Sequence, residues 1–322
     1  NHAAIVVLDA IGEWDTISIW GAEYIEGKAS YKKLWSQKYP HSIGLFYTAM
    51  TQKVGLTPME DEYILMGMAA YGDKNYSNIM SMGYVEDEFE VLFKENLHIG
   101  ANTNILGDLT DYTIAASTQE LTERLILNVM IRARSYKFSP NLVYMGGVAL
   151  NCSANRRLGT YFENIWIMPN PGDAGSSLGA AALAYGRRLN WVNAYLGHEI
   201  SGAYPTNRLL DSLLSDGIVG VASGRCEFGP RALGNRSIIA DPRNSSIREV
   251  VNYKTKHRQW FRPFAPSILE EKTKEWFEDD VFSPYMSFAI NFKEEKKSLV
   301  PAVVHRDGTG RLQTVSKKLN PN

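Results

Sequence analysis

The sequence contains few cysteines and little net charge, and both absences exclude classes of protein. Its 322 residues include two cysteines, Cys152 and Cys226, which are too few for a disulfide-stabilised secreted domain and are not spaced as a zinc-binding pair. The formal net charge is -1, so no overall electrostatic field attracts nucleic acid or an anionic membrane. We therefore expect a reduced, cytoplasmic protein in which any basic binding site is local.

Long hydrophobic runs are also absent. No apolar stretch approaches the roughly 20 residues that span a bilayer, and no charged region followed by an apolar core marks a signal peptide. The chain opens almost directly on the apolar stretch AIVVLDA and closes on QTVSKKLNPN, without an initiator methionine or a final helix or strand. We expect no membrane partner, and we expect further sequence beyond both ends.

The composition, 44% hydrophobic and 21% charged residues, is typical of folded globular domains. The length of the chain suits about two such domains. The first part of the chain alternates between strand and helix patterns. Residues 4–20 predict a hairpin that turns at Gly12, whereas 41–72 and 112–136 carry apolar residues at helical spacing. The acidic stretch 85–108 follows neither period, which predicts an irregular surface insertion.

Two strand–loop–helix units come next, over 141–158 and 163–186, and this repetition is typical of an α/β domain. Residues 187–205 turn polar, and we place the domain boundary there. The second domain has further strand signals and is predicted to be α+β. These signals are a buried strand at 217–224, a strand at 284–292 and a hairpin at 303–315.

Two aspartates stand where strands are expected to end. Asp9 follows the apolar run IVVL and precedes a turn, and Asp173 follows a strand and caps a helix of small residues. An ordinary turn aspartate and a helix N-cap explain them structurally. A ligand or metal carboxylate explains them functionally, because open α/β sheets bind ligands at the carboxyl ends of their strands. A cation held by both would still be short of ligands.

The stretch GGVALN contains Gly146, Gly147 and Asn151. A strand that ends in Gly-Gly and opens a helix presents backbone N–H groups and the helix dipole to an anion, and Asn151 is suited to a contact near a ribose. A plain tight turn is the structural alternative.

Basic residues gather in the second domain. Residues 224–238, GRCEFGPRALGNRSI, carry Arg225, Arg231 and Arg236 among glycines, and guanidinium groups suit carboxylates or phosphates. In 252–269, basic residues interleave with aromatic ones, which is also compatible with a nucleic-acid surface or a solvated face. The arginines lie beside proline kinks and large apolar residues, where uncompensated charge is costly. Small phosphorylated substrates are therefore the favoured partners, and nucleic acid is not expected.

Several stretches, taken together and in order, resemble one family. They are HSIGLFYTAMT, MGMAAYG, GGVALN, PGDAGSSLGAA, GPRALGNRSI, ADPR, FRPFAPSIL and PAVVHRDGTGRLQTV. The same order occurs in the O-carbamoyltransferases of antibiotic and nodulation-factor biosynthesis. The resemblance covers nearly the whole chain, and the pair GPRALGNRS and FRPFAP is its most specific part.

This resemblance implies both a fold and a reaction. Residues 1–190 would be the second lobe of an α/β actin-like (ASKHA) ATPase-fold domain, and 204–322 an α+β YrdC-like domain incomplete at its C-terminus. The YrdC-like part would use carbamoyl phosphate and ATP to form carbamoyladenylate. The actin-like part would then pass the carbamoyl group to a hydroxyl of a sugar or antibiotic-like acceptor. A homodimer is compatible with this expectation.

The resemblance also implies site residues. Asp9 and Asp173 would hold a divalent metal, iron or zinc-like, with Mg²⁺ as an alternative. The residues that would contact the adenylate or the nucleotide are Gly146, Gly147, Asn151, Gly229 and Asn235. The residues that would bind the anionic substrates are Arg231, Lys256, Arg262 and Arg311.

Some family features are not in these residues. Paired metal histidines and a histidine base would precede residue 1, and an NTSFN-like segment would follow residue 322. The family's Asp-Gly at the first turn is Asp9-Ala10 here. Two alternatives stay open: threonylcarbamoyl transfer for tRNA modification, and a non-catalytic nucleotide-binding core.

Overall fold

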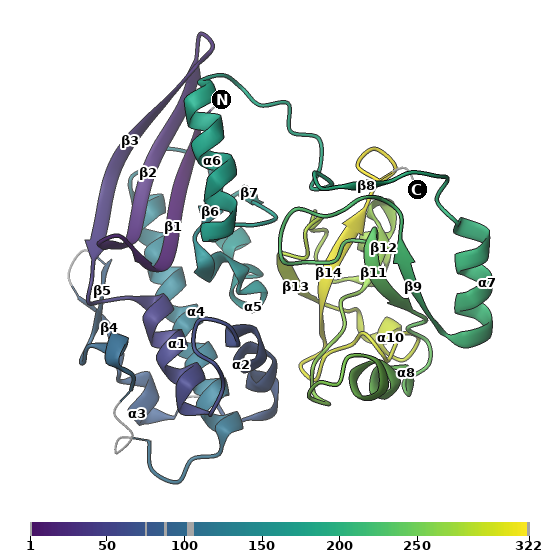
Figure 1. Cartoon of the computed structure of the whole chain (residues 1–322). Helices are drawn as coiled ribbons and strands as arrows, with labels where there is room; N and C mark the ends of the chain where they lie inside the picture. Colours follow the sequence, from purple (N-terminus) through teal and green to yellow (C-terminus); the bar gives the residue numbers. More distant parts are fainter. Residues whose placement is uncertain (1, 75, 87–88, 102–105, 321–322) are drawn as a thin grey trace. The chain divides into compact units, whose positions relative to one another are not determined.

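The computed structural model describes residues 2–74, 76–86, 89–101 and 106–320. The chain divides into two compact units, Asn1–Leu189 and Asn190–Asn322, which are drawn together in Figure 1 and are described separately below. In the described part of the chain, no helix is both long and apolar enough to cross a membrane.

The first unit is built on a five-stranded sheet in the order β3-β2-β1-β6-β7. Strands β1, β2 and β3 form an antiparallel meander, whereas β6 and β7 run parallel to β1. The strands are β1 (His2–Gly12), β2 (Asp15–Ile25), β3 (Lys28–Lys38), β6 (Asn141–Met145) and β7 (Asn164–Ile167). The hairpin predicted over 4–20 is confirmed, with Gly12 opposite Asp15. The third strand was not predicted, because its lysine-rich residues are mostly exposed and do not alternate.

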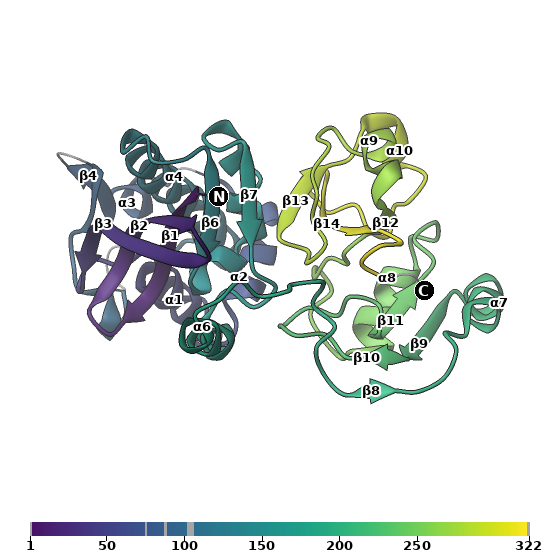
Figure 2. The ribbon, with the colours of Figure 1, turned by 90° about the horizontal axis from the view of Figure 1, so that it is seen from above.

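Alternation along β1 forms the centre of the core. Ala4, Val6 and Leu8 are buried, while the residues between them are partly exposed. Helices α1 (Ile43–Lys53) and α4 (Asp111–Ser135) pack against one another and against β1 (Figures 1 and 2). The helical patterns over 41–72 and 112–136 are therefore confirmed. The shorter helices of this part are α2 (Glu62–Met68), η1 (Ala69–Tyr71) and α3 (Ser77–Met80).

The prediction of an irregular insertion over 85–108 is wrong in its first part. β4 (Gly83–Glu86) and β5 (Glu90–Phe93) form a hairpin, followed by the short helix η3 (Leu97–Ile99). Val91 and Phe93 are buried, and the Phe93 ring stacks on Phe46 with centroids 5.4 Å apart. Two buried apolar residues in an otherwise acidic stretch give too little periodicity for a strand to be predicted. Residues 87–88 and 102–105 lie outside the described residues.

Both predicted strand–loop–helix units are present. After β6 the chain makes a 3₁₀ turn, η5 (Gly147–Leu150), and the short helices α5 (Cys152–Asn155) and η6 (Leu158–Thr160). After β7 it enters α6 (Asp173–Tyr185), which ends at Gly186 in the left-handed conformation. Among the residues of α6, all of them described, Gly175 is the buried one.

The second unit holds small sheets connected by loops. Its main sheet has the order β12-β14-β13, and β9 and β8 each pair with one further strand. The strands are β8 (Glu199–Ile200), β9 (Ile218–Ala222), β10 (Gly224–Arg225), β11 (Arg236–Ala240), β12 (Ser267–Leu269), β13 (Phe288–Asn291) and β14 (Thr309–Val315). The helices are α7 (Thr206–Asp216), α8 (Ile247–Glu249), the π-helix η7 (Val250–Thr255), η8 (Glu270–Lys272), α9 (Thr273–Trp276) and α10 (Glu294–Lys297).

Two strand predictions in this unit need correction. The stretch 217–224 does contain β9, but within that strand Val221 is the buried residue and the others are partly or fully exposed. The hairpin over 303–315 is wrong: β14 pairs with β13 and β12, and the chain before it forms turns closed by the bond from the Gly308 amide to the His305 carbonyl. The partners of β14 are distant in sequence, so local alternation misassigned them.

Candidate active site

The carboxyl ends of the three parallel strands meet in the first unit. Asp9 lies near the end of β1, Gly146 follows β6, and Gly172 follows β7. The Gly146 amide donates to the Pro171 carbonyl at 2.8 Å, which ties two of these ends together. Gly146 has φ +90°, and a Cβ there would lie 2.0 Å from the Leu8 carbonyl oxygen, so no other residue fits. This edge of the sheet is where open α/β sheets bind ligands.

Asp9 and Asp173 are close enough for their charges to interact. The Asp9 carboxylate accepts the Ala10 amide at 2.8 Å and is also hydrogen-bonded by the Gly147 amide. Burial raises the pKa of Asp9; the Ala10 amide opposes this rise, and the nearby charge of Asp173 adds to it. Two carboxylates that repel each other at the carboxyl end of a sheet form a plausible cation site.

Asp173 is not the helix cap predicted as its structural alternative. The N-cap position of α6 belongs to Gly172, Asp173 is the first helical residue, and no side chain caps this end. The Asp173 side chain is exposed. Its carboxylate stands in the first turn of α6, where the helix dipole favours negative charge.

The carboxylate pair fits some cations better than others. Among the described residues, no group of three or more His, Cys, Asp or Glu side chains is arranged to hold a metal ion. Carboxylate oxygens completed by water suit a hard cation such as Mg²⁺. Iron and zinc favour imidazole or thiolate ligands, and the pair itself contains neither.

Asn151 belongs to a buried hydrogen-bond network. Its Oδ1 caps α5 by accepting the Ala154 amide at 3.1 Å, and its carboxamide pairs in both directions with that of Gln119 at 3.0 Å. Gln119 also accepts the Tyr47 hydroxyl at 2.8 Å and donates to Glu123 at 2.9 Å. Most of the bonding capacity of Asn151 is therefore used within the protein. The signal that sequence reasoning missed is the pair Gln119 and Glu123, spaced i, i+4 on a buried face of α4.

This network, called here the α4 polar network, runs from Tyr47 to the surface. Glu123 is buried and pairs with the half-exposed Arg157 at 3.4 Å. Burial raises the pKa of Tyr47 well above its ordinary value, and the charge of Glu123 adds to the rise. Tyr47 therefore stays a hydrogen-bond donor at any ordinary pH.

In the second unit, two of the three arginines in 224–238 donate hydrogen bonds to backbone carbonyls of neighbouring segments. Arg225 donates to the carbonyls of Gly197 and Leu196 at 3.1 and 2.8 Å. Arg236 donates to four backbone carbonyls, at 2.8 to 3.1 Å. They are those of Ser223, Asn235, His198 and Gly224. The hypothesis that all three arginines bind anions is thus corrected for Arg225 and Arg236, whereas Arg231 is half-buried in the loop between them.

A carboxylate shapes that loop from within. One oxygen of Glu227 accepts the amides of Leu233, Asn235 and Arg236 at 2.9, 2.9 and 3.1 Å. Hydrogen bonds to a carboxylate are among the stronger ones in proteins. Gly229 and Gly234 have φ of +122° and +118°, which lets the chain curl around this oxygen.

Asn235 is a predicted nucleotide contact that the structure places inside the same loop. It is buried, and its side-chain amide donates to the Arg225 carbonyl at 2.8 Å. Its Oδ1 is enclosed and has no hydrogen-bond partner among the described residues.

Gln313 joins the three stretches that carry the predicted arginines. It is buried on β14, two residues from Arg311. Its side chain donates to the Leu233 carbonyl at 3.0 Å and accepts the Ser267 hydroxyl at 2.6 Å, and its amide donates to the Pro266 carbonyl at 2.9 Å. The loop of Arg231, the segment after Arg262 and the strand of Arg311 are therefore fixed to one side chain.

Lys256, Arg258 and Arg262 form a cation cluster. Partial burial lowers the pKa of Lys256, and the charges of Arg258 and then Arg262 lower it further. The Arg258 guanidinium also lies over the Phe264 ring, 4.9 Å from its centroid. Arg258 was not among the predicted site residues. Cations that repel one another in this way favour an anion between them.

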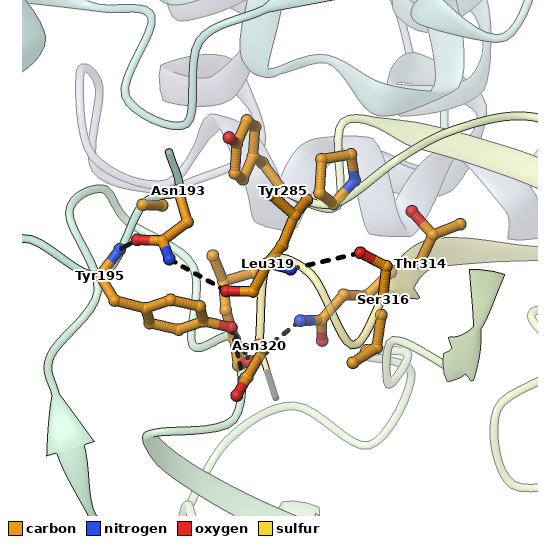
Figure 3. A pocket seen from close by; sticks show the side chains of 12 residues that line it. Asn193, Tyr195, Tyr285, Thr314, Ser316, Leu319 and Asn320 are labelled. Carbon is orange, nitrogen blue, oxygen red and sulfur yellow. Dashed lines mark hydrogen bonds between the residues drawn. The ribbon is translucent and has the colours of Figure 1, made fainter. Parts of the chain in front are cut away.

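A small pocket of the second unit is lined by Asn193, Tyr195 and Asn320 (Figure 3) and also by Leu233 of residues 224–238, called here the arginine loop. Asn193 donates to the Leu319 carbonyl at 2.9 Å, and Asn320 donates to the Tyr195 hydroxyl at 3.0 Å. The Tyr195 hydroxyl in turn donates to the Leu233 carbonyl at 3.0 Å. None of the predicted cationic residues lines this pocket, so we assign it to the support of the loop.

The order of the two units matches one family. Residues 1–182 match the family described as Carbamoyltransferase N-terminus, and residues 210–322 match Carbamoyltransferase C-terminus. The chain therefore belongs to the carbamoyltransferase family, which confirms the resemblance seen in its motifs.

Curated relatives agree with this assignment. The chain is 34% identical to nodulation protein NolO of Bradyrhizobium diazoefficiens, over 87% of the chain and 59% of that protein. It is 35% identical to nodulation protein U of Sinorhizobium fredii, over 66% of the chain and 41% of that protein. An uncharacterized protein of Synechocystis is 33% identical over the whole chain and 64% of its own length. The chain thus spans less than two thirds of the length of these relatives.

Proposed function

We propose that the full-length protein is an O-carbamoyltransferase that uses carbamoyl phosphate and ATP, forms carbamoyladenylate, and carbamoylates a hydroxyl of a small-molecule acceptor. The observation that carries the proposal, beside the family, is the cation cluster Lys256, Arg258 and Arg262. Partial burial and then the charges of Arg258 and Arg262 lower the pKa of Lys256. A polyanionic substrate would relieve that repulsion.

The balance of the reaction explains why many cations are needed. Forming carbamoyladenylate consumes one water, which releases phosphate from the donor and leaves carbamate. A carbamate oxygen then displaces diphosphate from the α-phosphorus of ATP, so both phosphorylated substrates and both leaving groups are polyanions. Arg231, Lys256, Arg262 and Arg311 would bind these groups and neutralise charge as it develops on the phosphate oxygens. Gln313 and Glu227 support the role by fixing the segments that carry Arg231 and Arg311.

The first unit would receive the adenylate. Gly146 and Gly147 lie beside Asp9 at the carboxyl ends of β1 and β6. Asp9 and Asp173 would hold a divalent cation, which supplies positive charge next to the adenylate phosphate. The strand order β3-β2-β1-β6-β7, with β2 antiparallel to its neighbours, supports the further proposal that this unit is an actin-like lobe. The YrdC-like nature of the second unit is proposed from the motifs alone.

The proposal is tested by the carbamoyl phosphate-dependent release of diphosphate from ATP. In the full-length protein, Arg262→Ala should lower this rate on the order of 100-fold or more, as loss of a charge-stabilising group does. Arg243→Ala is the matched control, because Arg243 is an exposed arginine of the same unit paired with Asp241. The proposal is wrong if Arg262→Ala and Arg243→Ala keep equal rates, or if diphosphate release ignores carbamoyl phosphate.

A further inference from the structure

Asn252 is a buried amide whose side-chain partners all lie on the segment of the cation cluster. It is 1% exposed, within the π-helix η7. Its Nδ2 donates to the carbonyls of Trp260 and Arg262 at 3.2 and 3.0 Å. Its Oδ1 accepts Nε of Arg258 at 2.8 Å. A single side chain thus contacts two of the three cation-bearing residues.

Lys256, the third cation, is bonded through its backbone to the same turn of η7. The Lys256 amide donates to the Val251 carbonyl, and the Arg258 amide donates to the Asn252 carbonyl, both at 2.9 Å. Between them His257 has φ +45°, in the left-handed region that few residues other than glycine adopt. Such a conformation persists where the surroundings over-determine it, and the bonds to Asn252 on the C-terminal side of His257 do so.

We propose that Asn252 is a positioning residue of the donor-phosphate site: its carboxamide fixes the segment that carries Arg258 and Arg262 to the π-helix that leads to Lys256. The inference rests on the proposed function, because it needs an anion between these cations. Asn252 would touch no substrate and would act through Arg258 and Arg262.

The physical reason is mutual repulsion. Three cations on one short segment repel one another, and the Asn252 side chain supplies three hydrogen bonds between the π-helix and the segment 258–262. Without the carboxamide, the Arg262 carbonyl and the Arg258 guanidinium lose buried partners, and the segment can relax. A shift of about 1 Å in a binding group lowers a rate by up to roughly 100-fold.

The first experiment measures steady-state kinetics of diphosphate release with Asn252→Ala in the full-length protein. We expect kcat/KM for carbamoyl phosphate to fall by about 10- to 100-fold, mainly through a higher KM. Asn291→Ala is the matched control, because Asn291 is an asparagine of the same unit whose carboxamide donates to Glu278 at 2.9 Å, away from the proposed site residues. It should stay within about 3-fold of wild type. Equal losses in both variants would overturn the inference.

A double-mutant cycle with Arg262→Ala separates positioning from general stability. If Asn252 acts through Arg262, then Asn252→Ala should cost less than about 3-fold once Arg262 is already alanine. Full, additive losses in the two backgrounds would overturn the inference, because Asn252 would then act independently of Arg262. A wild-type rate in Arg262→Ala itself would overturn the proposed function, and the inference with it.

Asn252→Asp covers the case in which the alanine variant does not fold. The aspartate keeps an acceptor for Arg258 but presents no donor to the Trp260 and Arg262 carbonyls. We expect a folded protein whose KM for carbamoyl phosphate is raised about 10-fold or more. Wild-type kinetics in this variant would contradict the inference directly.

Discussion

The carboxamides of Gln119 and Asn151 form a reciprocal pair, in which each nitrogen donates to the other's oxygen at 3.0 Å. This pair connects α4 to the loop GGVALN, and it leaves Gln119 bonded also to Tyr47 and Glu123. Its position makes the α4 polar network part of the structure that shapes the proposed adenylate loop.

Replacing Gln119 should therefore destabilise the first unit. Gln119→Leu keeps the approximate volume but leaves the Tyr47 hydroxyl and the Asn151 amide without their partner. Buried groups left unsatisfied cost about 1–3 kcal/mol each, so we expect a loss of about 2–4 kcal/mol in the free energy of unfolding. Urea denaturation measures it. Gln52→Leu, on the exposed face of α1, is the control; a similar small effect in both variants would contradict the assignment.

The arginine loop should depend on Glu227 in a graded way. Glu227→Ala removes the acceptor of three amides, and hydrogen bonds to charged groups contribute about 1.5–3 kcal/mol each. We expect hydrogen exchange of the Leu233, Asn235 and Arg236 amides to accelerate at least about 30-fold, a change of about 2 kcal/mol. Glu227→Gln keeps an oxygen acceptor, so its exchange rates should lie between those of wild type and those of Glu227→Ala. The exposed Glu249→Ala should leave these amides unchanged, and unchanged exchange in Glu227→Ala would refute the role.

Much of the first unit was predictable because its signals are local. Alternation placed β1 and β2, helical spacing placed α1 and α4, and the position of Asp9 and Asp173 after strands predicted that they meet. The misses have two causes. β3 and the hairpin of β4 and β5 carry too little apolar periodicity to be recognised. The pairing of β14 with β13 and β12 is decided by contacts distant in sequence, and no local pattern records it.

The site shows the same limit more sharply. Arg225 and Arg236 have the composition of anion ligands, yet their partners are backbone carbonyls, which every residue possesses and no sequence pattern marks. For the same reason Glu227 and Asn252 were not predicted: their partners are main-chain groups that the fold brings to them. Residue type predicted which side chains are able to bind anions. The positions of the main-chain groups decided which of these side chains bond to the backbone instead.

Asp9→Asn should make the protein more stable and less active. Because burial raises the pKa of Asp9 in the folded state, ionising it costs stability as pH rises through the interval between the unfolded and folded pKa values. The asparagine variant lacks this titration but keeps an acceptor for Ala10. Near pH 7, without divalent cations, its free energy of unfolding should exceed that of wild type, and the difference should vanish at acid pH, where Asp9 is protonated in both states; urea denaturation at the two pH values measures it.

The same variant tests the cation site. Added Mg²⁺ should raise the midpoint of thermal unfolding of the wild-type protein, because it binds the folded state alone, and it should leave Asp9→Asn unchanged. Asp108→Asn, an exposed control in the same unit, should respond like wild type. An equal Mg²⁺ response in Asp9→Asn would place the cation elsewhere.

Binding of carbamoyl phosphate should weaken at alkaline pH as Lys256 loses its proton. Its pKa lies below the ordinary lysine value of 10.5, so its charge is lost as pH rises through that lowered value, and KM for carbamoyl phosphate should rise over the same interval. Lys256→Arg keeps its charge at all these pH values, so its KM should rise less between about pH 7 and 10. Profiles that rise equally in both proteins would exclude Lys256 as the group responsible.

Direct detection of the intermediate tests the central claim most directly. The full-length protein is mixed with ATP and [¹³C]carbamoyl phosphate in a single turnover without acceptor, quenched, and analysed for a ¹³C-labelled adenylate by mass spectrometry. The account predicts labelled carbamoyladenylate together with diphosphate in wild type and in Arg243→Ala, and formation of both products about 100-fold more slowly or less in Arg262→Ala. Carbamoyl transfer without a labelled adenylate, or equal adenylate in Arg262→Ala, would contradict it.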